Sequence, residues 1–386
     1  MNPRRDLTTS QPSLAGQNEQ LDLQEVDLQE EEVPRLEWDF SLLASIPSSS
    51  SSLLASDSIG SIAFSPCNDN STYDSLLATA GIARKIRVYH LGSLIECVVQ
   101  SQPSVSICTP AKLSSVRFRS RNVIAAGDYD GVVTEYDITR GCGTAMYERD
   151  EHGGRRIWSI DYSLYTSLAA SGSDDCTAHL WDPRANSDTL HETIPFTSPV
   201  CCVEFDPSGD PFFATGCADK KAYVYDVRMV RQGPVKVLER HTRAVTYVRF
   251  AGHGRLVSSG ADGQHMLWDW SNGQCVREYT GHMSSRSFVG MGVWMHNGLV
   301  ASGSESNEVF VYDLRWGRPV WVQGFAEHVD STSEVHERRR NGGFVSAVSW
   351  WQGTGDRAGD DNGVLVAGGT DGVVKVFGCK RKEQIE

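Results

Sequence analysis

Apolar and polar positions recur along the chain in one order that is repeated seven times. Each copy begins with an apolar pair, continues through small residues and a polar turn, and ends in a strand-like stretch closed by an aromatic residue. The closing aromatics are Tyr89, Tyr136, Trp181, Tyr225, Trp268, Tyr312 and Phe377. They are 43 to 47 residues apart, except for the last pair, which is 65 apart. The pattern predicts an all-β protein of seven similar units.

A turn residue stands six positions before each closing aromatic. These residues are Ala83, Asp130, Asp175, Asp219, Asp262, Ser306 and Asp371. Aspartate suits a tight turn because its carboxylate can accept nearby backbone N–H groups. The period and the turns resemble those of a seven-bladed WD-repeat β-propeller with four strands per blade, covering roughly residues 58–379. His152, His241 and His282 are expected to be structural and to bond the turn aspartates of their blades.

The chain ends complete this picture. Apolar residues alternate with polar ones from Leu36 to Leu42, which predicts that residues 36–43 form the outer strand of the last blade and remove two exposed strand edges. We expect a disordered acidic tail rich in Ser and Gln, a Ser-rich linker, two loop insertions and a basic C-terminal tail. These segments are residues 1–35, 44–57, 325–343, 352–363 and 380–386.

Composition limits the classes of function. The formal net charge is −13, which argues against non-specific nucleic-acid binding. No apolar run approaches the roughly 18 residues of a membrane span, and the N-terminus lacks a secretory apolar region. The ten cysteines show no CxxC or metal-binding spacing and indicate reduced thiols. Because no catalytic set, zinc spacing or phosphate loop is present, we expect a protein without enzymatic activity, cofactor or metal.

One inner-strand position breaks the repeat. Six inner strands align by an apolar or aromatic anchor, and the sixth blade aligns ambiguously. The anchors are Phe64, Phe118, Tyr162, Phe205, Phe250 and Trp350, and the residues four positions earlier are Gly60, Ser114, Trp158, Cys201, Thr246 and Ser346. Five of these are small, as expected where inner strands crowd the propeller axis. Trp158 is therefore predicted to project into the channel mouth, although it could instead plug the top of the core.

Charged and aromatic residues are expected around Trp158. Lys112 and Arg156 lie six residues before their anchors and Arg243 lies seven before its own. Tyr129 and Asp174 precede turn aspartates, a position that faces the same rim. With Phe288, this set predicts a basic ring with aromatic anchors, suited to a short acidic peptide that carries an apolar plug.

The motifs resemble one family more closely. AKLSS, AAGDYDGVVTEYD, RRIWS, SGSDDC, TRAVTYVRF, SFVG and GSESNEVFVY resemble the propeller of the plant photomorphogenesis-repressor ubiquitin ligase and its SPA partners. The resemblance implies that the propeller top binds Val-Pro peptides with acidic residues upstream. By position, the family's contact residues fall on Lys112, Tyr129, Arg156, Trp158, Arg243 and Phe288. Arg243 replaces a family lysine, and Lys220 replaces a family histidine.

The short architecture is similar to that of the plant repressors of UV-B photomorphogenesis. This resemblance implies a negative regulator in the nucleus and cytoplasm that binds the C-terminal Val-Pro segment of the UV-B photoreceptor and promotes its return to the inactive dimer. Other implied partners are the ligase, SPA proteins and transcription factors with Val-Pro motifs. An acidic Val-Pro stretch in this chain, residues 30–34, could itself dock on such a propeller.

A second function class stays open. Asp-x-Arg endings that resemble the docking box for the cullin-4 adaptor place Arg184, Arg228 and Arg315 at the opposite rim. Such arginines could make charge-assisted bonds to the adaptor, which would make the chain a substrate receptor of a cullin-4-type ubiquitin ligase. They could equally satisfy local backbone groups within each blade.

Overall fold

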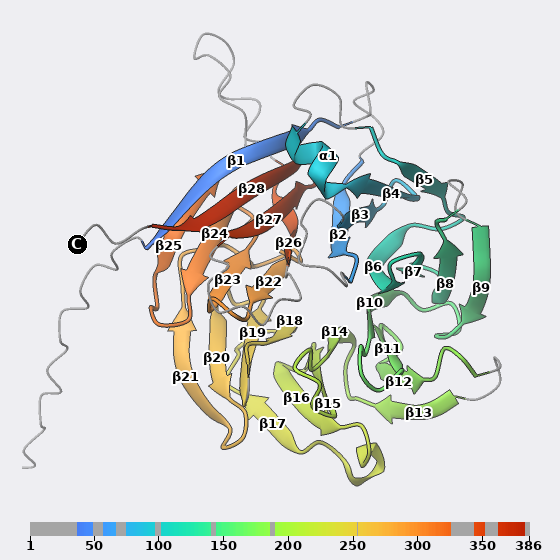
Figure 1. Cartoon of the computed structure of the whole chain (residues 1–386). Coiled ribbons are helices and arrows are strands. Elements are labelled where there is room, and N and C mark those ends of the chain that lie inside the picture. Colours follow the sequence, from blue (N-terminus) through green and yellow to red (C-terminus); the bar gives the residue numbers. More distant parts are fainter. Residues whose placement is uncertain are drawn as a thin grey trace, which may run out of the picture. The chain divides into compact units, whose positions relative to one another are not determined.

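The computed structural model describes residues 37–48, 57–66, 75–96, 102–139, 144–185, 190–252, 254–325, 343–351 and 362–382, which lie within one compact unit. These residues form seven four-stranded antiparallel sheets arranged around an axis (Figure 1). The first strand of each sheet lies nearest the axis and contacts the first strand of the next, and the seventh contacts the first. The predicted seven-bladed propeller is confirmed.

Strands follow one another outward in each sheet, except in the last. Blades 1 to 3 contain β2 (Ile59–Phe64), β3 (Leu76–Gly81), β4 (Lys85–His90), β5 (Val105–Cys108); β6 (Leu113–Ser120), β7 (Val123–Asp128), β8 (Val132–Asp137), β9 (Thr144–Asp150); β10 (Ile157–Tyr162), β11 (Ala169–Ser173), β12 (Thr177–Trp181), β13 (Leu190–Pro195). Blades 4 and 5 contain β14 (Val200–Phe205), β15 (Phe212–Cys217), β16 (Lys221–Asp226), β17 (Lys236–Glu239); β18 (Val245–Phe250), β19 (Arg255–Gly260), β20 (His265–Asp269), β21 (Gln274–Tyr279). Blades 6 and 7 contain β22 (Met291–Trp294), β23 (Leu299–Ser302), β24 (Glu308–Asp313), β25 (Pro319–Gly324); β26 (Val345–Trp351), β27 (Asn362–Gly369), β28 (Val374–Arg381), β1 (Trp38–Ile46).

The last blade takes its outer strand from the other end of the chain. β1 pairs antiparallel with β28, from Trp38 opposite Arg381 to Ile46 opposite Val374. The strand continues past residue 43, so the expected linker does not begin at 44. A bulge between Leu42 and Ala44 shifts the register, which leaves Leu42 55% exposed and buries Ala44 and Ile46. The simple alternation was therefore wrong for Leu42.

The C-terminal segment also differs from expectation. Lys380 and Arg381 belong to β28 and pair with Asp39 and Trp38, so residue 380 does not begin a tail. The pairing continues at the edge, where the Lys382 N–H donates to the Glu37 carbonyl at 2.7 Å. Residues 1–35, most of the linker and most of both expected insertions lie outside the described residues.

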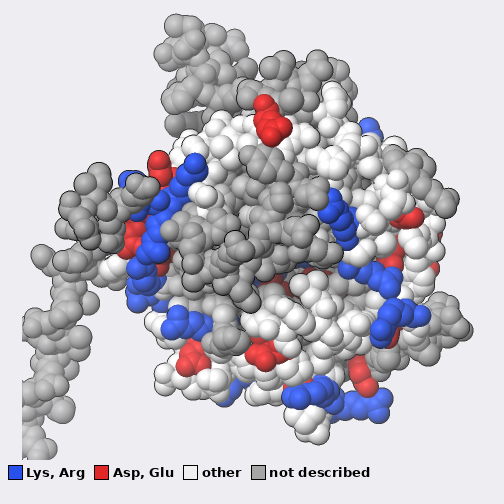
Figure 2. All heavy atoms as spheres, viewed as in Figure 1, with Lys and Arg blue, Asp and Glu red and all other residues white. Residues whose placement is uncertain are grey.

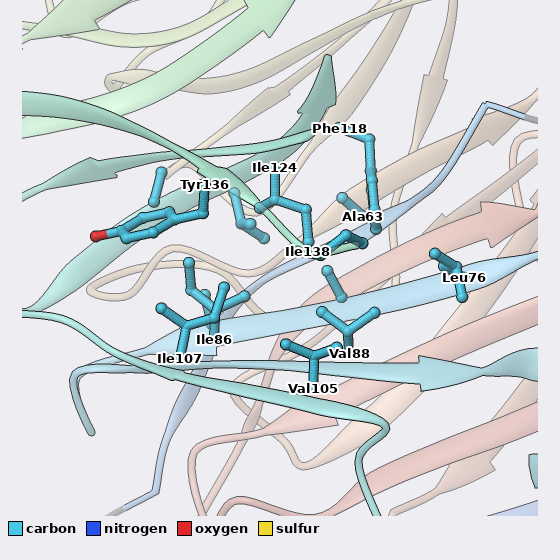
Figure 3. Packing of buried hydrophobic residues seen from close by; sticks show 14 of the residues in the cluster. Ala63, Leu76, Ile86, Val88, Val105, Ile107, Phe118, Ile124, Tyr136 and Ile138 are labelled. Carbon is cyan, nitrogen blue, oxygen red and sulfur yellow. The ribbon is translucent and has the colours of Figure 1, made fainter. Parts of the chain in front are cut away.

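Buried apolar residues fill the space between neighbouring blades. Figure 3 shows the cluster between blades 1 and 2, where side chains from β3 and β4 face those of β6 and β7. Ile86, Val88, Val116 and Ile124 are fully buried there. Burying a side chain of this size stabilises the fold by about 1.5–3 kcal/mol. Every closing aromatic lies on the third strand of its blade and is buried, which confirms the pattern used to count blades.

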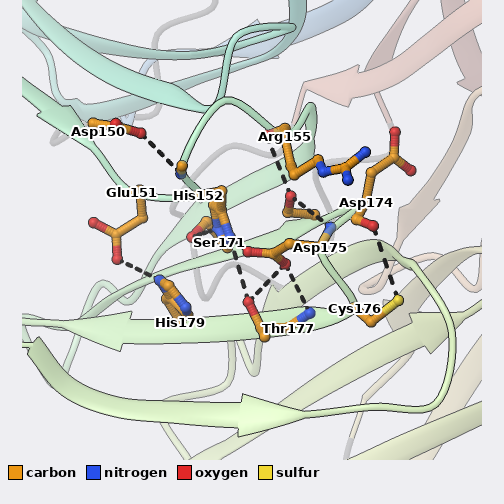
Figure 4. Close-up of polar contacts among 12 residues, drawn as sticks. Asp150, Glu151, His152, Arg155, Ser171, Asp174, Asp175, Cys176, Thr177 and His179 are labelled. Carbon is orange, nitrogen blue, oxygen red and sulfur yellow. Dashed lines mark hydrogen bonds and ion pairs between the residues drawn. The ribbon is translucent and has the colours of Figure 1, made fainter.

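Histidines connect strands within three blades, but in two ways. In blade 5, His241 contacts Asp262 at 3.0 Å and Ser258 at 2.7 Å, and the Trp268 indole N–H donates to the same serine. In blade 3, His152 contacts Asp175 and Ser171 at 2.7 and 2.8 Å (Figure 4). These two histidines bond turn aspartates as predicted.

The prediction was wrong for His282. Its blade has Ser306 in place of the turn aspartate, so no carboxylate stands at that position. His282 instead contacts the Tyr312 hydroxyl through its ring Nδ1 at 3.1 Å. Burial lowers the pKa of His282 to about 4, which keeps the ring neutral near pH 7.

Candidate functional site

A β-bulge sets the direction of Trp158. In six inner strands the pairing register shifts at the residue four positions before the anchor, and in blade 3 this residue is Trp158. In blades 2 and 7 the bulge residue is a serine, Ser114 or Ser346, whose hydroxyl donates to a carbonyl of the next blade. An indole cannot fit that small space between strands. Trp158 is half-buried and instead donates its indole N–H to the Asp174 carboxylate.

Strand pairing fixes the alignment of blade 6. In the other blades each anchor pairs with the residue twelve positions before the closing aromatic, and in blade 6 that residue, Val300, pairs with Val293. Val293 is therefore the anchor of blade 6, and Val289 lies four residues earlier. At the next residue, Gly290, a Cβ would lie 2.4 Å from the backbone nitrogen of Val348 and 2.6 Å from the Cα of Ala347, so the inner strands approach too closely there for any side chain.

Arg156 lies between two aromatic rings. Its guanidinium carbon is 3.8 Å from the ring centroid of Tyr129 and 3.5 Å from that of Trp158. Burial lowers the pKa of Arg156, but arginine stays charged in proteins. Among the described residues its guanidinium has no hydrogen-bond acceptor, and its Nε atom is buried. The cation is held by ring faces and keeps its hydrogen-bonding capacity.

Phe288 covers the other face of Trp158. The two rings are stacked, with centroids 4.2 Å apart and planes 14° apart. Arg156 and Phe288 are both too close to the indole centroid to share one face, so each occupies a different face. Neither ring face of Trp158 is therefore open to a ligand in this structure. Tyr129, Arg156, Trp158 and Phe288 form one continuous stack, which we call the mouth stack.

Glu305 holds the loop that carries Phe288. One carboxylate oxygen accepts the backbone N–H groups of Ser285, Arg286 and Ser287 at 2.7 to 2.9 Å. The other accepts the Ser285 hydroxyl at 2.8 Å. These hydrogen bonds outweigh burial and lower the pKa of Glu305 to about 2. The loop is therefore held by a carboxylate that stays ionised above about pH 4.

The remaining predicted residues lie at different distances from the stack. Arg243 is exposed and donates to the Ser285 carbonyl at 2.8 Å, which places it beside the Phe288 loop. Lys112 is exposed, and its carbonyl accepts the Tyr129 N–H at 2.9 Å. Lys220 is exposed on the β15–β16 turn with φ 79°, and no contact links it to the stack among the described residues.

Sequence reasoning missed Glu305 and Tyr247. Glu305 precedes a turn residue, Ser306, in the same register that selected Tyr129 and Asp174, so that rule applied to blade 6 would have found it. Tyr247 packs edge-on against Phe288, with centroids 6.3 Å apart. It directly follows a bulge residue, and no pattern singles it out.

The opposite-rim arginines share one geometry. The Arg184 guanidinium donates to both oxygens of Asp182 at 3.0 and 2.7 Å, and Arg228 bonds Asp226 in the same way at 2.9 and 2.6 Å. Arg315 bonds Asp313 likewise and also donates to Glu37 beside β1 at 2.9 Å. The three side chains stay 54 to 66% exposed. Arg315 therefore has a structural partner in the closing strand that the other two lack.

One group of side chains has the composition of a metal site. Ligand atoms of His152, Asp175 and His179 lie within 4.8 Å of one another. Both ring nitrogens of His152 already contact Asp175 and Ser171, and His179 contacts Glu151 at 2.8 Å (Figure 4). These contacts assign the group to the internal bonding of blade 3.

Surface charge is mixed on the face shown in Figure 2. Visible Lys and Arg side chains lie around the rim in small groups separated by uncharged and acidic atoms. The described atoms of this face therefore present no extended basic surface of the kind that binds a phosphate backbone. No helix in the described part of the chain is long and apolar enough to cross a membrane.

Comparison with known proteins agrees with the fold. The family model "WD domain, G-beta repeat" matches residues 143–182, 188–226 and 232–269. The seven sheets and these repeats define a WD-repeat β-propeller protein.

Full-length relatives narrow the class. The chain is 48% identical to WD repeat-containing protein RUP1 of Arabidopsis thaliana over 363 residues, which cover 91% of this chain and 87% of the relative. It is 47% identical to RUP2 of the same plant over 352 residues, covering 85% and 89%. E3 ubiquitin-protein ligase COP1 of Arabidopsis thaliana is 33% identical over 310 residues, covering 79% of this chain and 43% of the ligase. The chain belongs to the WD-repeat protein family of RUP1 and RUP2.

The family assignment confirms two predictions from the sequence. The resemblance to the short plant repressors, rather than to the longer ligase alone, agrees with the coverage of RUP1 and RUP2. These relatives are WD-repeat propellers, a family without enzymatic activity, as the residue inventory predicts.

Proposed function

We propose that this protein is a negative regulator of UV-B signalling that binds acidic Val-Pro peptides at the channel mouth. The C-terminal segment of the UV-B photoreceptor is the ligand that family membership favours. The mouth stack is the observation that carries the proposal, because it combines a desolvated cation with three aromatic rings at the propeller axis. Clusters of this kind are typical of interface hot spots.

The ligand has two parts, and each has a counterpart at the site. Arg156 keeps unused donors, and Lys112 and Arg243 are exposed nearby, so upstream carboxylates meet positive charge. The Val-Pro plug meets the aromatic rings. Because both faces of Trp158 are covered, the plug must shift Phe288 or pack on its outer face. Breaking one aromatic pair costs about 0.5–1.5 kcal/mol, which a buried Val-Pro segment offsets.

Calorimetry with the photoreceptor's C-terminal peptide tests the proposal. We expect saturable binding, and a matched peptide with Val-Pro replaced by Ala-Ala should bind at least about tenfold more weakly, because apolar burial is lost. Arg156→Glu should slow association and reduce its dependence on salt, because it reverses the charge at the mouth. Equal binding of the two peptides would reject the Val-Pro site.

A second function is favoured by the repeated Asp-x-Arg geometry. Arg184 and Arg228 are held by their aspartates yet remain exposed, as a docking surface for the cullin-4 adaptor requires. Arg184→Ala with Arg228→Ala should reduce adaptor recovery in a pull-down and leave peptide binding intact. Arg315→Ala is made separately, because it also removes the bond to Glu37 and would loosen β1. Unchanged recovery in the double variant would assign these arginines to blade structure alone.

Further partners follow from the same peptide chemistry. Transcription factors with Val-Pro motifs, the photomorphogenesis-repressor ligase and SPA proteins would compete for, or assemble around, the channel mouth. We propose that the protein acts where these partners act, in the nucleus and cytoplasm. A fluorescently tagged chain followed in plant cells before and after UV-B exposure tests this location.

A further inference from the structure

The central channel contains a second cavity, far from the mouth stack. Its volume is about 280 Å³, and the last residues of the inner strands form its wall, whereas Trp158 lies near the start of its strand. A smaller cavity of about 40 Å³ lies beneath Trp158, and Arg117 and Arg249 line both cavities. The larger cavity therefore occupies the opposite end of the channel, and we call it the lower cavity.

Charged residues line one side of the lower cavity. The residue directly before the anchor is Arg117, Asp161, Glu204 and Arg249 in blades 2 to 5. The Arg117 Nε atom lies 3.4 Å from the Asp161 carboxylate, and the Arg249 Nε atom lies 3.4 Å from the Glu204 carboxylate. In blades 1, 6 and 7 the equivalent residues are Ala63, Gly292 and Ser349. The cavity thus has a charged half and a half without charges.

Hydrogen-bond donors are in excess in the charged half. The second oxygen of Asp161 accepts the Phe205 N–H at 2.8 Å, and that of Glu204 accepts the Phe250 N–H at 2.6 Å. An arginine has five N–H donors and no acceptor. Within the described residues, the two Nη atoms of Arg117 donate to no acceptor, although its side chain is only 22% exposed. The lower cavity therefore has donors on one wall and apolar surface on the other.

We propose that the lower cavity binds a small organic acid, with its carboxylate on the Nη atoms of Arg117 and its apolar body against Ile62, Val348 and Trp350. The planar guanidinium matches a carboxylate with two parallel hydrogen bonds. The three apolar residues line the same cavity and are at most 7% exposed. The volume is close to the lower limit for small-molecule pockets, which restricts the ligand to a compact molecule.

The carboxyl groups of the wall make anion binding depend on pH. Glu204 faces Arg249, Asp161, Arg117 and the Phe250 N–H, and burial raises its pKa to about 7. Burial likewise raises the pKa of Asp161. Asp206 also lines the cavity, so three carboxyl groups accompany the two arginines, and protonation of Glu204 near neutral pH lowers the negative charge that an anion meets. A carboxylic acid with an ordinary pKa is still ionised at pH 6, so its binding should tighten between pH 8 and pH 6.

Benzoate is the probe for this site, and benzamide is the matched uncharged control. Calorimetry on the full chain should show one saturable benzoate site and no comparable benzamide site. Arg117→Leu should weaken benzoate binding by about tenfold or more, because the charge-assisted bonds are lost. Arg119→Leu is the matched control variant: Arg119 lies on the same strand, pairs with Glu135 at 2.6 Å and does not line the cavity. It should bind benzoate like the wild type.

A second variant keeps the charged wall intact. Ser349→Phe places a ring in the lower cavity and should abolish benzoate binding while leaving Val-Pro peptide binding unchanged. Ser349→Phe still tests the proposal if Arg117→Leu does not fold. Three results would overturn the proposal: no saturable benzoate binding at pH 6, equal affinity for benzamide, or unchanged benzoate affinity in Ser349→Phe.

Discussion

The mouth and the lower end of the channel are built from the same inner strands but use different positions along them. At the mouth, the position four residues before the anchor is a β-bulge. The one large residue at this position, Trp158, is covered by Phe288. At the lower end, the position precedes the anchor in regular strand, and charged side chains line an open cavity. The bulge at Trp158 therefore closes the mouth with aromatic rings, whereas regular pleating at the position before the anchor leaves a cavity lined by charged side chains.

Removing the closing strand should destabilise the propeller and impair ligand binding at both ends of the channel. Deletion of residues 1–45 removes most of β1 and the burial of Trp38, so the melting temperature should fall by about 10 °C or more. Deletion of residues 1–30 should leave it nearly unchanged. Thermal melts of the two truncations, with peptide and benzoate titrations, provide the measurement. Equal melting temperatures would show that β1 does not close the ring, and loss of one ligand alone would show that the two ends are held independently.

Trp158→Ala should separate the two ends. It removes the central ring of the mouth stack and should cost about 2 kcal/mol or more of peptide affinity, roughly 30-fold. The melting temperature and benzoate binding should remain near wild type, because Trp158 is half-buried and does not line the lower cavity. A wild-type peptide affinity in this variant would show that the peptide binds elsewhere. A strongly lowered melting temperature would show that Trp158 belongs to the core.

Glu305→Gln should sharpen the comparison at the mouth. The amide keeps the size of the side chain but weakens three backbone hydrogen bonds to one oxygen, so the Phe288 loop is less well held. We expect about 1 kcal/mol lower peptide affinity, roughly fivefold, by calorimetry. Glu308→Gln is the matched control, since Glu308 accepts the Ser306 hydroxyl and does not bond the loop. Identical affinities of the two variants would contradict a positioning role for Glu305.

The smallest expected effect is a pH dependence of opposite sign at the two ends. The folded-state pKa of Glu305 is lowered from 4.5 to about 2, so its contribution to stability is present above pH 4.5 and is lost as pH falls through 2. The pKa of Glu204 is raised from 4.5 to about 7, so its contribution favours folding at low pH and declines as pH rises from 4.5 to 7.

Melting temperatures of Glu305→Gln and Glu204→Gln, measured with the wild type across pH 3 to 8, test these signs. The deficit of Glu305→Gln relative to wild type should shrink by a few degrees toward pH 3. Glu204→Gln should gain stability relative to wild type as pH rises from 5 to 8. Parallel curves for the wild type and either variant would show that the carboxyl group concerned titrates as it does in the unfolded chain.

The sequence predicts those features that depend on local repetition. The spacing of closing aromatics gives the seven blades, and the register relative to the anchors brings Arg156, Trp158 and Asp174 into one cluster. Leu42 was misplaced because a bulge, which the alternation does not reveal, interrupts β1 directly after this residue. The stacking of Phe288 on Trp158 depends on a loop whose shape is set by Glu305 in another segment.

The lower cavity shows what a repeat comparison can add. Its paired charged residues all stand directly before the anchor of an inner strand. Each residue on its own is typical of a solvent-exposed position in a strand. Only the ring arrangement brings Arg117 beside Asp161 and Glu204 beside Arg249, because these partners come from different blades. Neither the pairing nor the cavity volume follows from periodicity within a single blade.

The pairing of β1 with β28 has a consequence for synthesis on the ribosome. Residues 38–46 are made well before their partner strand, which begins only at Val374. At typical translation rates of about 5–20 residues per second, roughly 20–70 s pass between the synthesis of β1 and that of β28. Throughout this interval β1 lacks the strand with which it pairs. A nascent chain of this protein therefore has a defined period in which chaperone binding at residues 38–46 competes with aggregation.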